Sequence, residues 1–109
     1  MHKGYTLNYF INFFKNIPDH RWTTGTFQEG NTVRHCALGH AKRRSGKTLD
    51  ETSLDNQNYV RSAALADLLR GNVVAINDGI GAYETLGSTP CGRILRALRN
   101  RKRYGKILK

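Results

Sequence analysis

The segment 32–48 of the chain combines residue types that serve three different chemistries. Cys36 beside His35 pairs a thiol with a base, as a cysteine nucleophile requires. Cys36 and His40 are four residues apart, a spacing that brings a thiolate and an imidazole to one face of a helix, as metal ligands require. The letters GKT at 46–48 match the end of a phosphate-binding loop. Each chemistry needs further residues elsewhere in the chain.

A phosphate-binding loop is not supported by the residues around GKT. The motif Gly-x-x-x-x-Gly-Lys-Ser/Thr needs a glycine where the chain has Ala41. It also needs a strand before the loop and a helix after it. Here a helical pattern precedes GKT, and the polar, turn-rich segment 47–58 follows it. We therefore expect no nucleotide hydrolysis at this sequence.

A metal site around Cys36 and His40 would need ligands from other parts of the chain. The candidates that would complete it are His20, His35 and Cys91. A zinc site of recognisable spacing has two paired ligand clusters, and only one is present here. On a helix, His35 and His40 also point to different faces. The pattern favours a buried thiol and a polar helix end, so we expect no bound metal and no cofactor.

Cys36 is a weak candidate for a catalytic nucleophile, with His35 as its base. It lies near the expected start of a helix, where the helix dipole lowers the pKa of a thiol. His20 is an alternative base, and Asn77 or Asp78 could orient either histidine. Asn77 and Asp78 are more simply explained as a turn or a helix cap. Because only geometry identifies a triad, we expect a protein that is not an enzyme and keep a cysteine-dependent hydrolase as an alternative.

The fold that must position these residues is predicted to be mainly α. A chain of 109 residues fits a single domain. The letters VVAIND at 73–78 form a short β-branched run that suits a strand or a helical turn equally. We expect a compact bundle of about four helices, with or without a short β segment, and α+β is the alternative. The expected helices are 5–16, a helix that begins after Thr32 and ends before Gly46, 59–70, and a last helix from Pro90.

The first and last helices have well-defined apolar faces. Pro90 fits the first position of the last helix, where Ser88 or Thr89 would be the N-cap. Trp22 should fold back onto the core, because an exposed tryptophan leaves a large apolar area in water. The expected core residues of these two helices are Leu7, Phe10, Ile11, Phe13 and Phe14, and Cys91, Ile94, Leu95 and Leu98.

Positive charge is concentrated at the C-terminus. The chain has 18 Lys and Arg against 8 Asp and Glu, a formal net charge of +10. Residues 91–109 hold eight of the cations and no acid, whereas residues 1–90 are nearly balanced. Such asymmetry indicates an anionic partner, and the alternative is a charged face that only keeps the protein in solution.

The last helix, with the tail that follows it to residue 109, is the predicted binding element. Arginine outnumbers lysine in it, and arginine contacts phosphate or carboxylate through two parallel hydrogen bonds. Tyr104 lies among the cations and could stack on a base. The chain has no recognised DNA-reading motif, so we expect binding without sequence specificity. The predicted binding residues are Arg93, Arg96, Arg99, Arg101, Lys102, Arg103, Tyr104 and Lys106.

A cytoplasmic location is predicted from the apolar segments of the chain. No segment approaches the roughly 18 apolar residues of a membrane-spanning helix, so we expect no membrane partner. The letters LNYFINFF at 7–14 are interrupted by Asn8 and Asn12, and no small-residue cleavage site follows, which argues against a secretory signal. In the cytoplasm, Cys36 and Cys91 should be free thiols.

Part of the chain resembles a family of small bacterial and bacteriophage proteins of unknown function. The resemblance lies in HRWTTG, RHCALGHAKRR and VVAIND and spans about residues 21–100. His40 departs from the family pattern, in which a small residue usually follows the glycine. The resemblance implies a shared fold and a phage or mobile-element setting in a host cytoplasm, and it transfers no catalytic residue. The matching residues are Cys36, Leu38, Gly39, Asn77 and Asp78.

The sequence therefore predicts a small, basic, non-enzymatic binding protein. Its arginine-rich C-terminal helix would engage a polyanion, and nucleic acid is the first expectation. The first alternative is an inhibitor that binds an acidic surface of a host or defence protein. The second is the hydrolase that uses Cys36.

Overall fold

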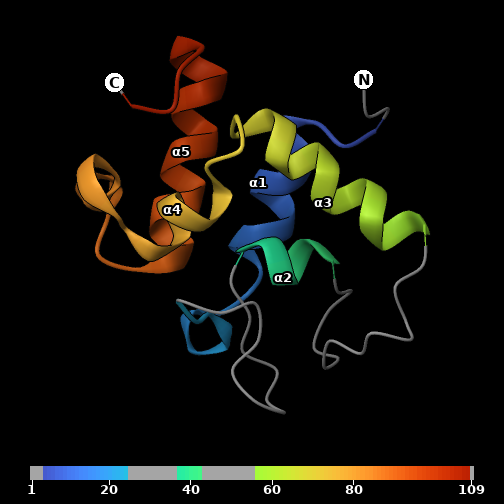
Figure 1. The fold of residues 1–109 in the computed structure, drawn as a ribbon, viewed down its shortest axis with the longest axis horizontal. Helices are drawn as coiled ribbons and strands as arrows, with labels where there is room; N and C mark the ends of the chain where they lie inside the picture. The colour runs from blue at the N-terminus through green and yellow to red at the C-terminus, as the bar shows by residue number, and fades with distance from the viewer. Residues whose placement is uncertain (1–3, 25–36, 43–55, 109) are drawn as a thin grey trace.

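A computed structural model describes residues 4–24, 37–42 and 56–108 of the chain. These segments contain helices and no strand, which confirms the predicted mainly α fold. None of the helices described is both long and apolar enough to span a bilayer. The helices are α1 (Leu7–Lys15), η1 (Asp19–Arg21), α2 (Ala37–Lys42), α3 (Asn56–Leu68), α4 (Val73–Asp78), η3 (Gly81–Leu86) and α5 (Pro90–Tyr104), where η marks a 3₁₀ helix (Figure 1).

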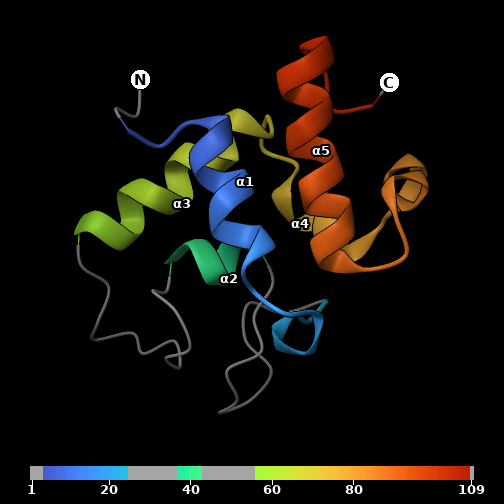
Figure 2. The ribbon, with the colours of Figure 1, turned by 180° about the vertical axis from the view of Figure 1, so that it is seen from behind.

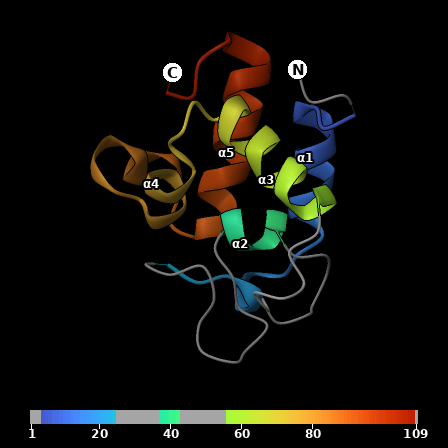
Figure 3. The same ribbon diagram turned by 45° about the vertical axis from the view of Figure 1, so that its right-hand side comes forward.

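The last helix, α5, lies at the centre of the bundle. It packs against α1 on one side and against α4 and η3 on another, and Figure 3 shows it between α4 and α1. In the opposite view, α1 is nearest the viewer and lies between α3 and α5 (Figure 2). The short helix α2 packs mainly on α3 and also touches α4 and α5. Four of the described helices therefore pack against α5, the most basic helix among them.

The first helix turns the predicted apolar stripe toward the core, although Leu7, Ile11 and Phe13 are only partly buried. Thr6 caps α1 through its side-chain hydroxyl, and Phe10 and Phe14 are completely buried. Trp22 is also buried, with its ring centroid 5.4 Å from that of Phe14. Its indole N–H donates to the carbonyl oxygen of Ile17 at 3.2 Å. The expectation that Trp22 folds back onto the core is confirmed.

Residues 73–78 form helix α4, so the strand alternative for this segment is wrong. Val73, Ile76 and Asn77 are buried, whereas Val74 is 43% exposed. This is a helical spacing, because a strand would place Val74 and Ile76 on the same face. Gly79 ends the helix in the left-handed conformation, with φ of 70°.

The start of α5 is as predicted, and its buried face is wider than predicted. The Thr89 hydroxyl accepts a hydrogen bond from the backbone N–H of Gly92 at 3.0 Å, and Pro90 is the first helical residue. Leu95 is only half-buried. Two polar residues, Arg93 and Asn100, lie on the buried face. The buried residues of α5 are Cys91, Arg93, Ile94, Ala97, Leu98 and Asn100.

Candidate nucleic-acid interface

The predicted binding residue Arg93 is buried rather than exposed, with 8% of its surface open to solvent. Its Nε donates to the carbonyl oxygens of Ile76 and Asn77, both at 3.1 Å. Nη2 donates to Asn77 O at 2.6 Å, and Nη1 donates to Gly87 O at 3.2 Å. A cation at the carboxyl end of a helix meets unpaired carbonyls and the negative end of the dipole. Arg93 is therefore a cap that α5 supplies to α4, and its guanidinium does not face a ligand.

Gly79 provides the space that the Arg93 guanidinium occupies. A Cβ at position 79 would lie 3.0 Å from both Cζ and Nε of Arg93. The left-handed backbone of Gly79 also disfavours any side chain. Glycine at this position therefore serves both the end of α4 and the packing of α5 against it.

Two further arginines cap the carboxyl ends of neighbouring helices. Nε of Arg101, another predicted binding residue, donates to the carbonyl oxygen of Leu68 at the end of α3, at 3.2 Å. Nε of Arg61 donates to the carbonyl oxygen of Ala41 near the end of α2, at 2.6 Å. Arg61 is 5% exposed, and its guanidinium lies 5.9 Å from the ring centroid of Phe13. Hydrogen bonds from a charged donor are stronger than neutral ones, so these arginines hold the bundle together.

The other predicted cations form one exposed surface, which we call the basic face. From Arg96 onward, every exposed residue of α5 is Arg or Lys except Tyr104 at its last position. Arg96, Arg99 and Arg103 are spaced three and four residues apart, so they form a row along the helix of about 10 Å. The basic face consists of Arg96, Arg99, Lys102, Arg103 and Lys106.

No carboxylate pairs with the basic face in the part of the chain that the structure describes. Lys102 is the member that contacts another helix, because its Nζ donates to Oδ1 of Asn8 in α1 at 2.7 Å. That contact is to a neutral amide and leaves the charge of Lys102 in place. None of the described acids therefore neutralises the basic face by direct contact.

Tyr104 ends α5 beside the basic face and is 39% exposed. The guanidinium carbon of Arg103 lies 5.5 Å from its ring centroid, a cation–π distance. A base that stacked on the Tyr104 ring would therefore have a cation next to it. The placement is compatible with the stacking role predicted for Tyr104.

Cys36 and His35 lie outside the described residues, so the cysteine-nucleophile hypothesis stays a prediction. The structure does place Asn77, the proposed orienting residue, in the core with no exposed surface. Its Oδ1 accepts from the backbone N–H of Ala37, and its Nδ2 donates to Thr23 O, both at 2.9 Å. Nδ2 also donates to Oδ1 of Asp78 at 2.9 Å. These bonds cap the start of α2 from another helix and occupy the amide that would have oriented a histidine.

The proposed metal ligand His40 is buried and has a structural role. Its Nε2 donates to the carbonyl oxygen of Arg21 at 2.9 Å, and its ring centroid lies 4.9 Å from that of Trp22. His20 is exposed on η1. Within residues 4–24, 37–42 and 56–108, no three His, Cys, Asp or Glu side chains gather as metal ligands.

Cys91 is a free and buried thiol in the first turn of α5. Its Sγ lies 3.7 Å from the carbonyl oxygen of Phe14 and 4.0 Å from that of Ile17, so the S–H can donate to the chain at the end of α1. Burial, helped by the Asp19 carboxylate, raises the pKa of Cys91 from 9.0 to about 11, although the Arg99 charge acts in the opposite direction. The thiol is therefore protonated at neutral pH.

We expect Cys91 to resist alkylation in the native protein. The thiolate is the reactive form, and a pKa of about 11 instead of 9.0 lowers its fraction roughly 100-fold near neutral pH. In the variant Cys36→Ser, iodoacetamide should label native protein slowly and denatured protein quickly, as measured by intact mass. Because the folded state holds this proton more tightly, the resulting stabilisation is present below about pH 9 and is lost as the pH rises toward 11. Equal labelling rates for native and denatured protein would contradict this assignment.

Two of the eight predicted binding residues, Arg93 and Arg101, thus fix α5 in the bundle, and the other six are exposed at or beside the basic face. The resemblance to bacterial and bacteriophage proteins stays a prediction. No protein-family model, no curated protein and no solved structure matches this chain.

Proposed function

We propose that this protein binds nucleic acid, without catalysis, through the basic face of α5. One observation carries the proposal: from Arg96 onward, the exposed residues of α5 are cations up to the terminal Tyr104, and no described acid pairs with these cations. A row of arginines and lysines on one helix is the electrostatic footprint of a protein that follows a phosphate backbone. Affinity from such contacts does not depend on base sequence.

A face that only keeps the protein in solution explains this arrangement less well. Surfaces that serve solubility mix both signs of charge. Like charges three or four residues apart on a helix repel each other, at a cost of about 0.2–0.5 kcal/mol for each pair. Arg96, Arg99 and Arg103 have this spacing. An anionic ligand would remove that repulsion.

The way in which α5 is held also supports a binding role. Arg93 fastens its first half to α4 and η3, and Arg101 fastens its second half to α3. The exposed cations therefore project from a helix whose position is fixed before a ligand arrives. Pre-organisation of this kind lowers the entropy cost of binding.

The proposal includes a cytoplasmic setting, where nucleic acid is accessible. The free thiol of Cys91 is compatible with a reducing compartment. A phage or mobile-element origin, which the sequence resemblance implies, belongs to the same proposal. In that setting the nucleic acid would be that of the phage or of its host.

Reversing the charge of the basic face should abolish binding without unfolding the protein. We expect the triple variant Arg96→Glu, Arg99→Glu, Arg103→Glu to lose binding to generic DNA, because exposed side chains contribute little to stability. For the wild type, log K should fall linearly with log salt, by about 0.9 for each phosphate neutralised. Binding is measured by fluorescence anisotropy and folding by far-UV circular dichroism.

Net charge is controlled with two matched double variants. Arg99→Gln with Arg103→Gln lowers the net charge by the same amount as Val74→Glu with Ile80→Glu, whose residues are exposed outside the basic face. The first pair should lower the salt slope by about 2 and the second should not. Equal effects of the two pairs would refute a role for the basic face. If the wild type does not bind DNA but captures an acidic protein from nuclease-treated lysate, the inhibitor alternative replaces the proposal.

A further inference from the structure

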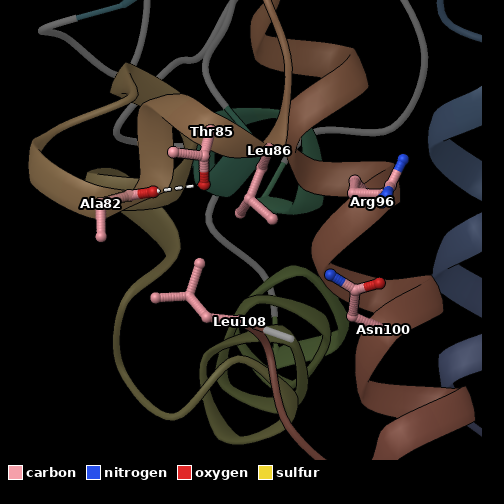
Figure 4. A pocket seen from close by; sticks show the side chains of 6 residues that line it. All are labelled: Ala82, Thr85, Leu86, Arg96, Asn100 and Leu108. Carbon is pink, nitrogen blue, oxygen red and sulfur yellow. Dashed lines mark hydrogen bonds between the residues drawn. The ribbon is translucent and has the colours of Figure 1, made fainter.

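A pocket of about 310 Å³ opens next to the basic face, between η3, α5 and the C-terminal segment of the described chain. Ala82 and Thr85 lie on one side of it, opposite Arg96 and Asn100 (Figure 4). A volume of this order is at the lower end for pockets that bind small molecules, so it suits a single flat heterocycle. The lining residues are Ala82, Thr85, Leu86, Arg96, Asn100 and Leu108.

The walls of this pocket combine apolar surface with hydrogen-bonding groups. Leu86 and Leu108 supply apolar side chains. The Thr85 hydroxyl donates to a backbone carbonyl of η3 at 2.7 Å, so its lone pairs remain able to accept. Nδ2 of Asn100 donates to Ile107 O at 2.8 Å, while its Oδ1 has no donor among the residues described. A nucleobase has apolar faces and a hydrogen-bonding edge, which match such walls.

Arg96 belongs both to this pocket and to the basic face. A strand whose phosphates followed Arg96, Arg99 and Arg103 would therefore pass the opening of the pocket. The bases of a single strand are free to turn out of the stack, whereas a base in a duplex must first be unpaired and flipped. The position of the pocket thus favours a single strand over a duplex.

We infer that the ligand of the basic face is a single-stranded nucleic acid, DNA or RNA, with one base held in this pocket. The inference rests on the proposed function and names its ligand class. Phosphates on Arg96, Arg99 and Arg103 supply affinity, and the base between Arg96 and Thr85 adds contacts that a duplex does not make. Asn100 and Thr85 hydrogen-bond the edge of the base.

The test compares strands that carry equal charge but differ in their bases. Single strands of DNA and RNA of about 16 nucleotides, the upper end of known site sizes for one small domain, are titrated by fluorescence anisotropy beside an abasic strand of equal length and the DNA duplex. The wild type should bind the base-containing single strand at least about fivefold more tightly than the abasic strand or the duplex. The double variant Ala82→Met, Thr85→Met fills the pocket without adding an aromatic ring and should remove that preference.

The control replaces two exposed residues that do not line the pocket, Val74→Met with Ile80→Met, and should keep the preference. If the filled variant unfolds at a lower temperature than the wild type, Thr85→Leu repeats the test with a smaller change. A preference seen with DNA, RNA or both supports the inference. The role of the pocket is overturned, and the proposed function is not, if the wild type binds base-containing and abasic strands equally. The same holds if the variant with the filled pocket keeps the preference. Failure to bind any nucleic acid overturns the proposed function as well.

Discussion

Replacement of Arg93 by leucine should lower the free energy of unfolding by about 3 kcal/mol, because buried carbonyl oxygens then lose a charged donor. Arg93 donates to Ile76 O, Asn77 O and Gly87 O from a position that is 8% exposed. Leucine fills part of the volume but offers no hydrogen bond and no charge for the end of α4. Domains of this size have about 5–15 kcal/mol of stability in total, so the loss is severe. Urea denaturation followed by far-UV circular dichroism measures it.

The matched control is Arg96→Leu, three residues further along the same helix. Arg96 is exposed, so this change should alter the free energy of unfolding by no more than about 0.5 kcal/mol. Arg93→Lys keeps the charge but cannot reach three carbonyls at once, so it should fall between the two. The binding assay should show the reverse order, with Arg96→Leu the more damaging change once folding is confirmed. If Arg93→Leu were as stable as Arg96→Leu, the capping role would be excluded.

Asn77→Asp should destabilise the protein by about 3 kcal/mol or more at neutral pH, although the two side chains have almost the same shape. Nδ2 of Asn77 donates to Thr23 O and to Oδ1 of Asp78, both at 2.9 Å. The variant places a carboxylate oxygen against a carbonyl and a second carboxylate in a fully buried position. An unpaired buried charge of this kind is strongly unfavourable. The hydrogen bond from the Ala37 N–H to Oδ1 is retained, so the loss of stability reports the replacement of the Nδ2 donor by a carboxylate oxygen.

The loss caused by Asn77→Asp should depend on pH. Burial and the neighbouring Asp78 raise the pKa of the new carboxyl group in the folded state above its unfolded value. The folded state then holds the proton more tightly, so the destabilisation is small below about pH 4 and grows as the pH rises through the unfolded pKa. Urea denaturation near pH 7 and near pH 4 measures the difference. Asn12→Asp, exposed on α1, is the control, and an equal loss for Asn77→Asp at both pH values would contradict the argument.

The sequence by itself determined the features that depend on neighbours within one turn of helix. The stripe of Phe10 and Phe14 and the cap and proline that begin α5 were predicted and are confirmed. The end of α3 was predicted less well: the helix stops at Leu68, three residues before Gly71, and the left-handed turn includes Arg70, with φ of 56°, as well as Gly71, with φ of 77°. Such signals are local, because residues three or four apart share a helix face and caps act on the first turn. They needed no knowledge of the remaining chain.

Local signals did not determine the secondary structure of the segment 73–78. Six residues are too few for periodicity to separate a strand from a helix. The decision came from partners far away in the sequence: the Asn77 side chain bonds to Ala37 and Thr23, and its carbonyl oxygen accepts from Arg93. Only the folded chain brings these groups together, so the residue types alone left both readings open.

The charged residues of α5 were also predicted only in part from the sequence. Composition determined that positive charge gathers at the C-terminus, but it did not separate the cations that hold the fold from those that face solvent. One signal was present, because Arg101 follows Ala97 by four residues and Leu98 by three and therefore lies toward the buried side. Tertiary structure decided the rest: a buried guanidinium needs carbonyl oxygens from other helices, and only folding brought Ile76 and Leu68 within reach of Arg93 and Arg101.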